Sequence, residues 1–529
     1  MQIIIPMSGV GQRFLDAGYN VPKPIISIDG REMIAYVLDC FPGETNLVFI
    51  CNEEHLANTE MGSILKKLAP DALIVSIPPH KLGPVYAVSM AFEAISDTEE
   101  VIVNYCDFGK LWDYQKFLHE ARSKNSDGAI SGYKGFHPHM LGTTNYAFCR
   151  EANGELLEIR EKQPFTNNRM QEFASDGTYY FKSGKILKQY FTQLIEAGIQ
   201  TGGEYYVSMV YNLMVEDGLK VSLFEIEHML QWGTPSDLRE YLHYSRLFQN
   251  LAQADFLQTE PYSATLLMPM AGLGSRFKDS SHKLPKPLIP ISERPMVAQA
   301  VRSLPRCESN LFLVREELLN QHSLKEGLDT LWPEAKIISL SEQTEGQAST
   351  CAIGVAQCER EKPVLIGACD TALLWDKEKF NQLVDNPQTD CVVFSFRNHP
   401  LANKNPSAYG WLAVDSNNRV KKISVKKPLH PNPEDDLLIV GSFWFKKPEV
   451  FQAGYEYLLK HQIRVNNEFY VDSLAQVLLE LGYCVVSFEV LEYLCFGTPE
   501  ELDSFLYWQK FFSKVKWHPY EMFNRCPLL

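Results

Sequence analysis

The sequence lacks the features that would mark a membrane, secreted or nucleic-acid-binding protein. No apolar run approaches the roughly 20 residues of a membrane span. The first residues contain no basic stretch followed by a long apolar one, so a secretion signal is not expected. The formal net charge is -15, whereas general nucleic-acid binding calls for a basic face. We therefore expect no membrane span, no nucleic-acid partner and a cytoplasmic location.

The twelve cysteines are scattered, and none forms a C-x-x-C pair. This spacing argues against both a zinc site and a disulfide framework, and is typical of small buried thiols in a reducing compartment. The composition is otherwise that of an ordinary globular protein, with 45% apolar and 22% charged residues. At 529 residues the chain exceeds one ordinary core, so two or three domains are expected.

An internal repeat indicates that the number of domains is two. Residues 3–14 return as residues 266–277, and the Pro-Lys-Pro of residues 22–24 returns at 285–287. A separation of 263 residues joins these motifs and also Asp107 to Asp370, while 264 residues separate later pairs such as Gly233-Thr234-Pro235 and Gly497-Thr498-Pro499. One net residue is therefore inserted between the two sets. The period is far longer than a solenoid repeat, so each copy is a complete domain.

The predicted domains are residues 1–255 and 264–529. An amphipathic helical pattern over 238–253 precedes a short linker at 259–263. In the second copy, the matching helical stretch carries the aromatic residues Phe505, Tyr507, Trp508, Phe511 and Phe512, which predict a packing face between the domains or between subunits.

Short apolar strands alternate with helical patterns within each copy, as in residues 46–50, 72–76 and 101–105. This alternation predicts an α/β protein of two tandem three-layer αβα domains, each with a mainly parallel sheet. Ligands of such sheets bind at the loops that leave the carboxyl ends of the strands. The motifs described next follow such strands.

A glycine-rich loop follows the first strand of each copy. Glycines let the backbone approach a bulky anion, so Gly9 and Gly11, with Gly272 and Gly274, are candidates to bind phosphate. The loop lacks the G-K-[ST] of a P-loop and the third glycine of a dinucleotide fingerprint. Taken alone, it fits an ordinary strand-to-helix turn equally well.

Two further residues in each copy strengthen the phosphate interpretation. Lys23 and Lys286 stand between prolines, which restrict the backbone and present the ammonium rigidly. Asp107 and Asp370 end buried strands, where a carboxylate either caps a helix or binds a metal. Mg²⁺ with phosphate substrates takes one or two carboxylates, so the nearby Arg and Lys favour the metal.

The order of glycine loop with Arg, P-K-P, strand-end Asp, E-K and G-T-P resembles the sugar-phosphate nucleotidyltransferases, or nucleotide-sugar pyrophosphorylases, and their cytidylyltransferase relatives. The resemblance covers nearly all of each copy. It implies a Rossmann-like (GT-A-like) fold and Mg²⁺-dependent transfer of a nucleotidyl group from a nucleoside triphosphate to a phosphorylated small molecule, as in nucleotide-sugar or polysaccharide biosynthesis.

The resemblance also implies roles for individual residues. Arg13 and Arg276 would hold the β and γ phosphates, Lys23 and Lys286 the α-phosphate, and Asp107 and Asp370 the Mg²⁺. The positions implied to lie at the base are Gly83, Gly346, Gln343 and Gln347. The positions implied to bind the acceptor are Glu161, Lys162, Gly177 and Glu204 in the first copy, and Lys426, Gly441 and Glu468 in the second.

The nucleophile in such a transfer is a phosphate oxygen that is already ionised at neutral pH, so no protein base is needed. We accordingly assign no catalytic role to His80, His137, His139, His228 or His282.

Some positions depart from the family pattern. Gln231 and Cys495 stand where many members have a second metal-binding Asp, with Glu225 and Glu489 as nearby substitutes. The copies also differ from each other: Glu161 aligns with Val425, and Asp472 aligns with Ser208. The halves are therefore expected to have diverged in acceptor or in task.

Three functions remain open at this point. One or both copies transfer nucleotidyl groups, or one copy catalyses while the other is a nucleotide-binding regulatory or assembly module, or the chain is a glycosyltransferase of related fold. The last usually needs a D-x-D-type motif, which neither Asp107-Phe108-Gly109 nor Asp370-Thr371-Ala372 supplies. The resemblance of the second copy to the cytidylyltransferases implies CTP or UTP rather than a purine nucleotide. The acceptor and the formation of a homo-oligomer stay open.

Overall fold

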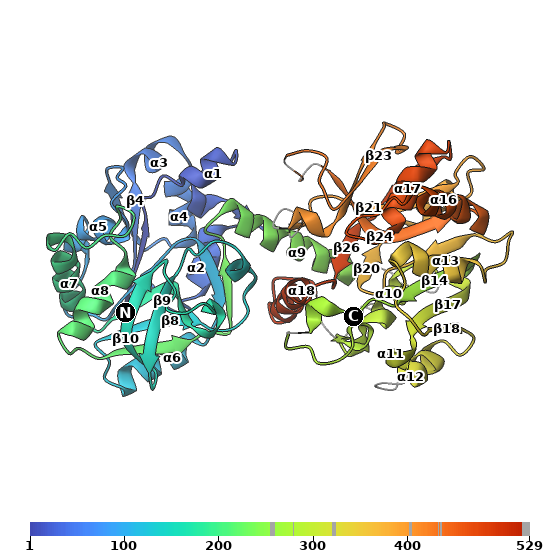
Figure 1. The fold of residues 1–529 in the computed structure, drawn as a ribbon. Coiled ribbons are helices and arrows are strands. Elements are labelled where there is room, and N and C mark those ends of the chain that lie inside the picture. The colour runs from blue at the N-terminus through green and yellow to red at the C-terminus, as the bar shows by residue number, and fades with distance from the viewer. Residues whose placement is uncertain are drawn as a thin grey trace. The chain divides into compact units, whose positions relative to one another are not determined.

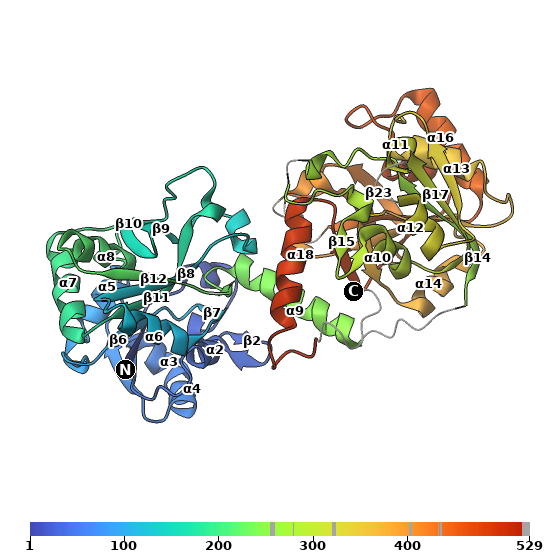
Figure 2. The ribbon, with the colours of Figure 1, turned by 90° about the horizontal axis from the view of Figure 1, so that it is seen from below.

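The structure is a computed structural model that describes residues 1–253, 260–278, 280–319, 324–400, 402, 405–431, 433 and 436–520 (Figures 1 and 2). The chain forms two compact units, Met1–Leu242 and His243–Leu529. None of the helices in the described ranges is both long and apolar enough to cross a membrane.

Unit 1 is built on a nine-stranded sheet of order β5-β4-β1-β6-β11-β8-β12-β10-β9. Strands β5, β4, β1 and β6 are parallel, β11 runs antiparallel to both β6 and β8, and β12 is parallel to β8. Two small sheets pair β2 with β3 and β7 with β13. The strands are β1 Gln2–Met7, β2 Ser27–Ile28, β3 Arg31–Glu32, β4 Leu47–Asn52, β5 Leu73–Ile77, β6 Val101–Asn104, β7 Phe108–Leu111, β8 Gly128–Tyr133, β9 Ala147–Ala152, β10 Glu155–Glu161, β11 Phe173–Phe181, β12 Val221–Glu225 and β13 His228–Gln231.

Helices cover both faces of this sheet. Because successive side chains of a strand point to opposite faces, Ile3 and Ile5 of β1 enter one buried apolar cluster while Ile4 enters the other. The first cluster includes side chains of α2, α4 and α6, and the second those of α5, α7 and α8. The helices are α1 Gln12–Asp16, α2 Met33–Asp39, α3 Glu53–Asn58, α4 Met61–Leu68, α5 Pro84–Ser89, α6 Tyr114–Ser123, α7 Gly184–Glu196, α8 Val207–Glu216 and α9 Pro235–Gln253.

Unit 2 repeats the design. Its main sheet has the order β18-β17-β14-β19-β24-β21-β25, with β22 joining β24 and β23 joining β22. Leu266 and Leu267 of β14 again enter separate apolar clusters. The strands are β14 Tyr262–Met270, β15 Pro290–Ile291, β16 Arg294–Pro295, β17 Cys307–Arg315, β18 Lys336–Leu340, β19 Val364–Ile366, β20 Thr371–Leu374, β21 Cys391–Phe396, β22 Gly410–Val414, β23 Val420–Val425, β24 Leu437–Phe445, β25 Val485–Glu489 and β26 Glu492–Cys495.

The helices of unit 2 are α10 Met296–Ser303, α11 Glu316–Leu319, α12 Leu324–Leu331, α13 Gln347–Val355, α14 Lys377–Val384, α16 Pro448–His461, α17 Val471–Glu480 and α18 Pro499–Phe512. The start of α18 lies in the G-T-P motif, where Thr498 and Glu501 form a reciprocal capping box. The predicted α/β class, with two tandem domains of three layers, is confirmed, and the antiparallel β11 and β24 make each sheet mixed.

The division between the units falls inside α9. The predicted amphipathic helix 238–253 lies within α9, whose last residues, from His243, belong to unit 2. There the ring of Phe248 packs in tilted contacts against the rings of Phe505, Phe512 and Tyr520. The aromatic face predicted for the last helix thus packs, at these positions, within unit 2. Of the predicted linker, Thr259 lies outside the described residues, while Tyr262 and Ser263 already belong to β14.

Candidate active site

The glycine loop of each unit turns from its first strand into a short helix. Gly11 has φ 72° directly before α1, and Gly274 has φ 62° before the 3₁₀ turn Ser275–Phe277, so both adopt the left-handed conformation that favours glycine. A Cβ on Gly11 would lie 3.8 Å from Cβ of Lys23, and one on Gly274 would lie 3.4 Å from Cβ of Lys286. The loop and the Pro-Lys-Pro motif therefore lie against each other in both units.

In unit 1, three motifs distant in sequence meet at Lys23. Its Nζ donates to Oδ2 of Asp107 at 2.6 Å and to the carbonyl oxygen of Gly233 at 2.9 Å. The ammonium also lies 5.2 Å from the ring centre of Phe14. Asp107 follows β6, and its carbonyl oxygen accepts a bond from the N–H of Trp232, which brings the G-T-P motif to this strand end. The structure thus joins P-K-P, the strand-end Asp and G-T-P into one cluster.

Unit 2 repeats this cluster. Nζ of Lys286 donates to Oδ2 of Asp370 and, at 3.0 Å, to the carbonyl oxygen of Gly497. Burial favours the neutral forms of both groups, but their attraction outweighs it. The pKa of Lys286 is therefore raised and that of Asp370 is lowered, with a further contribution to Asp370 from Arg276. Both groups are charged at neutral pH.

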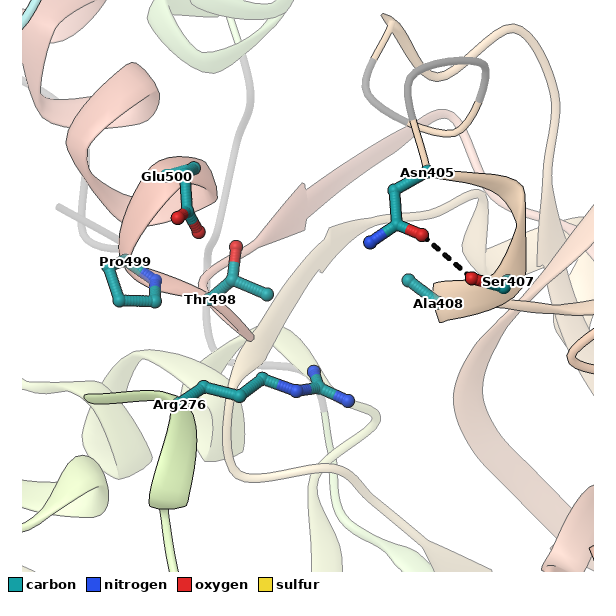
Figure 3. A pocket seen from close by; sticks show the side chains of 7 residues that line it. All are labelled: Arg276, Asn405, Ser407, Ala408, Thr498, Pro499 and Glu500. Carbon is teal, nitrogen blue, oxygen red and sulfur yellow. Dashed lines mark hydrogen bonds between the residues drawn. The ribbon is translucent and has the colours of Figure 1, made fainter. Parts of the chain in front are cut away.

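The two arginines of the glycine loops differ from the bonded lysines of these clusters. Arg13 and Arg276 are exposed, and neither guanidinium has a hydrogen-bond or ion-pair partner among the described residues. Arg276 lines a cavity of about 460 Å³ together with Asn405, Ser407, Ala408, Thr498, Pro499 and Glu500. Figure 3 shows its guanidinium extending toward the segment that carries Ser407 and Ala408. A cation placed in this way is available to an anionic ligand.

On the predicted acceptor side of unit 1, a chain of hydrogen bonds joins the E-K motif to the start of α8. Nζ of Lys162 donates to the Tyr206 hydroxyl at 2.6 Å, and that hydroxyl donates to Oε2 of Glu204. The Ser208 hydroxyl donates to Oε2 of Glu161 at 2.6 Å. Burial raises the pKa of Glu161 to about 7, although the Ser208 bond and the Lys162 charge act in the opposite direction.

Unit 2 keeps the lysine and changes its surroundings. Nζ of Lys426 donates to the carbonyl oxygen of Ala408 at 2.5 Å and lies 5.8 Å from the ring centre of Tyr470. Burial lowers the pKa of Lys426, as does the charge of Arg276, whereas Asp472 and Glu468 raise it. The lysine therefore lies within electrostatic reach of both Arg276 and the two carboxylates.

The four glycines predicted to lie at the base or at the acceptor each have a positive φ. A Cβ on Gly83 (φ 87°) would lie 2.8 Å from the backbone N and O of Tyr205, and one on Gly346 (φ 124°) would lie 2.6 Å from those of Phe469. A Cβ on Gly177 (φ 100°) would lie 3.0 Å from the ring of Tyr105, and one on Gly441 (φ 83°) would lie 3.2 Å from Cβ of Ala368. Close packing of the chain itself therefore requires the first two glycines, and their role at a base remains a prediction.

The remaining predicted base positions differ between the units. Gln343 is exposed and Gln347 is the first residue of α13. In unit 1, His80 occupies the place of Gln343 and is tied to Ser8 at 3.2 Å through Nε2 and to the N–H of Leu82 through Nδ1. Both ring nitrogens of His80 are therefore engaged in contacts within unit 1.

The substitutes suggested for a second metal ligand occupy equivalent places, since Glu225 ends β12 and Glu489 ends β25, and both are exposed. Glu489 pairs with Arg397 and lines a different cavity, so it is not placed beside Asp370. Sequence reasoning missed Glu501: a Cβ on Gly497 would lie 3.1 Å from its Oε2 and 3.4 Å from Oδ2 of Asp370. Glu501 is also occupied as a helix cap and as the acceptor of the Tyr409 hydroxyl.

Two other groups were missed. The hydroxyl of Tyr206 bridges Lys162 and Glu204, and Tyr470 takes the matching place beside Lys426. The backbone carbonyls of Gly233 and Gly497 accept from the catalytic lysine candidates. The tyrosine carried a signal, since it recurs one position before the first helical residue of α8 and α17. A backbone carbonyl acceptor cannot be identified from the sequence, because every residue has such a carbonyl group.

A family model described as the MobA-like NTP transferase domain matches residues 3–172 and 268–430, together more than half of the chain. The chain is 28% identical over 231 residues to the bifunctional protein GlmU of Clostridioides difficile (strain 630), and the aligned part covers 42% of this chain and 46% of that protein. The GlmU protein of Rhodopseudomonas palustris (strain BisB5) is 24% identical over 229 residues, which cover 42% of this chain and 47% of that protein. This chain thus spans about half the length of the curated relatives it matches.

Two solved structures are also similar. A nucleoside-diphosphate-sugar pyrophosphorylase from Vibrio cholerae RC9 is 19% identical and covers 46% of this chain and 99% of its own, with a TM-score of 0.39. The inositol-1-phosphate CTP transferase from T. maritima is 15% identical and covers 49% of this chain and 99% of its own, with a TM-score of 0.38.

Proposed function

Because the chain belongs to the MobA-like NTP transferase domain family, we propose that each of its units transfers a nucleotidyl group from a nucleoside triphosphate to a sugar phosphate and releases pyrophosphate. The observation that carries the proposal is the cluster of Lys, Asp and glycine carbonyl, which both units repeat together with an arginine that has no bonded partner in the part of the chain that the structure describes. The product would be a nucleotide sugar.

The charges suit this chemistry. An oxygen of the acceptor phosphate attacks the α-phosphorus, a new P–O bond forms, and the bond from the α-phosphorus to the bridging oxygen breaks as pyrophosphate leaves. Two unit like charges 4 Å apart repel by about 4 kcal/mol at an effective dielectric constant near 20. Lys23 and Lys286 would neutralise charge at the α-phosphate, while Arg13 and Arg276 would hold the departing phosphates.

We further propose that Asp107 and Asp370 help to hold Mg²⁺. Each carboxylate has one oxygen bonded to the lysine, which leaves the other for a cation. Among the described residues, no group of three His, Cys, Asp or Glu side chains could hold a metal without help. This donor set fits Mg²⁺, which takes one or two carboxylates and completes its shell with phosphate oxygens and water. When bound, the ion would supply further positive charge to the phosphates.

On the acceptor side, Lys162 and Lys426 would bind the acceptor phosphate. The bond of Lys162 to Tyr206 directs its ammonium, while Tyr206 is itself fixed by Glu204. Neighbouring carboxylates would accept hydrogen bonds from the hydroxyl groups of the sugar. No side chain has to remove a proton, since the attacking phosphate oxygen is already ionised.

The test separates the two units. Lys23→Ala and Lys286→Ala are assayed singly and together for pyrophosphate release, over a panel of triphosphates and sugar 1-phosphates. Loss of a positioned cation should reduce the turnover of the affected unit by about 10²–10³-fold. Lys116→Ala in α6 and Lys283→Ala, both at exposed lysines outside the cluster, serve as controls.

An active double variant would refute the site assignment. If only one single variant lowers release, one unit catalyses and the other does not. Removal of divalent cations with a chelator, followed by addition of Mg²⁺, tests the metal proposal. Release that survives complete chelation would contradict it.

A further inference from the structure

The acceptor sides of the two units differ by a coordinated set of three substitutions. In unit 1, β9 and β10 pair Ala147 with Glu161. In unit 2, the matching strands β22 and β23 pair Gly410 with Val425. The third position lies in the first turn of the following helix, which has Ser208 in α8 and Asp472 in α17. Each unit thus has one carboxylate at these three positions, delivered by a strand in unit 1 and by a helix in unit 2.

The three positions are in contact, so they change together for a steric reason. In unit 1 the Glu161 carboxylate accepts from the hydroxyl of Ser208, whose side chain is small enough to leave it room. In unit 2 the Asp472 carboxylate lies so close to Gly410 that a Cβ there would be only 2.2 Å from its Oδ2. The methyl group that Ala147 has at the matching position could not coexist with the Asp472 side chain in its present position. The carboxylate has therefore been moved rather than lost.

Both carboxylates occupy comparable electrostatic environments. Burial raises the pKa of Glu161 to about 7 and that of Asp472 to about 6, and in each case the neighbouring acceptor lysine opposes the shift. The lysines have nearly the same left-handed backbone, with φ 59° at Lys162 and 60° at Lys426. The lysine proposed to bind the phosphate is therefore kept in both units. The carboxylate beside it comes from strand β10 in unit 1 and from helix α17 in unit 2.

The two side chains are also only partly covered. Glu161 and Asp472 both have intermediate exposure, as do Lys162 and Lys426. A partly desolvated carboxylate of this kind gains from a ligand that donates a hydrogen bond, because the bond replaces water that burial has removed. Hydroxyl groups of a sugar phosphate are donors of the required kind.

We propose that this relocated carboxylate makes the two units take different sugar phosphates, which differ in the position of the hydroxyl group that Glu161 or Asp472 accepts. The inference rests on the proposed function. A site that hydrogen-bonds a substrate hydroxyl rejects an analogue that lacks it there, because its polar group is then left without a partner. Glu161 and Asp472 are thus specificity-determining residues of the same reaction.

The experiment exchanges the three residues in the full chain. With Lys286→Ala present, unit 1 is assayed alone, and with Lys23→Ala, unit 2 is assayed alone. The probes are glucose, galactose, mannose and N-acetylglucosamine 1-phosphates, and the readout is kcat/KM for pyrophosphate release. Ala147→Gly/Glu161→Val/Ser208→Asp should move the ranking of unit 1 toward that of unit 2. The reverse set, Gly410→Ala/Val425→Glu/Asp472→Ser, should do the opposite, with relative kcat/KM changing by about tenfold or more.

A control separates specificity from stability. Glu161→Gln keeps the shape of the side chain, so it should fold and should change the ranking of the sugars without a uniform loss over all of them. Equal rankings in the two units, or rankings that the exchange and Glu161→Gln both leave unchanged, would overturn the inference while leaving nucleotidyl transfer intact. If one unit alone releases pyrophosphate, the two units do not divide the sugar phosphates between them, and the inference is overturned. Absence of pyrophosphate release from both units would reject the proposed function, and this inference with it.

Discussion

Single residues of the Lys–Asp clusters were predictable because they recur in both copies. Lys23 and Asp107 were chosen from their types and spacing, and the structure brings them within 2.6 Å. Tyr206 was not predicted as a site residue, because its contribution is a hydrogen bond to Lys162, 44 positions away. Such a bond depends on how the strand end and the helix start meet, which no local pattern encodes.

At this scale the glycines give a sharp prediction. Gly83 has φ 87° and ψ 178°, a region that is essentially restricted to glycine, and Tyr205 backbone atoms lie 2.8 Å from the place of a Cβ. Gly83→Ala should lower the free energy of unfolding of unit 1 by about 3–5 kcal/mol, from backbone strain and overpacking together. Hydrogen exchange of unit 1 peptides measures the change, with unit 2 peptides as an internal reference.

The matched control is Gly43→Ala. Gly43 has a similar φ of 88°, but nothing lies within 4 Å of the place of its Cβ. Only strain then applies, and the cost should be about 1 kcal/mol. Equal costs at the two positions would contradict the close packing against Tyr205.

At the scale of elements, the sequence predicted alternating strands and helices but not the mixed sheet. A buried antiparallel strand such as β11, with all nine residues buried, has the same apolar pattern as a parallel one. Its direction depends on its partners β6 and β8, which are distant in the chain. This matters for the site, because β11 carries Gly177 to the end of β6.

One pair of elements carries a buried ion pair in unit 1 alone. Lys110 of β7 donates to Asp176 of β11 at 3.0 Å, and both side chains are fully buried. Burial lowers the pKa of Lys110, opposed by Asp176. The corresponding residues of unit 2 are Leu373 in β20 and Val440 in β24, which are buried and apolar.

The residues of unit 2 at these positions therefore suggest the substitutions for a test. Lys110→Leu alone should destabilise unit 1 by about 3–5 kcal/mol, because it leaves the Asp176 charge buried without its partner. Lys110→Leu/Asp176→Val should recover part of that loss, since an apolar pair avoids the desolvation of both charges. The recovery is incomplete because the buried Ser131 hydroxyl bonds to both Lys110 and Asp176 and loses these partners. Unfolding by urea, followed by hydrogen exchange in unit 1, measures both variants. A double variant no more stable than the single one would refute this reasoning.

At the scale of the whole molecule, the repeat predicted two domains and the family match agrees with two segments. The predicted boundary followed the end of the helical pattern, whereas the structure divides the chain inside α9. The reason is that Tyr244, Leu247, Phe248 and Leu251 are buried, and Tyr244 and Phe248 pack on aromatic residues of unit 2. Arg246 and Asn250 also bond to the buried Glu492.

A fragment that begins at residue 243 should therefore be stable where one that begins at 264 is not. Each large apolar side chain buried contributes about 1.5–3 kcal/mol, so the four named above match a large part of the 5–15 kcal/mol that stabilises a typical domain. The shorter fragment would also leave Glu492 without Arg246 and Asn250. Solubility and the thermal unfolding midpoint of the two fragments measure the difference. Equal midpoints would show that the last turns of α9 contribute nothing to unit 2.

The sequence by itself determined that the chain is a tandem repeat of an α/β domain, and it singled out the recurring Arg, Lys and Asp as candidate site residues, because both depend on residue type and spacing along the chain. Only the tertiary structure decided which strands run antiparallel and where one unit ends. It also decided that Asp472 supplies in unit 2 the carboxylate that Glu161 supplies in unit 1. Those features arise from contacts between segments far apart in sequence, where the volume of one side chain, such as Ala147 or Gly410, decides what its neighbour can be.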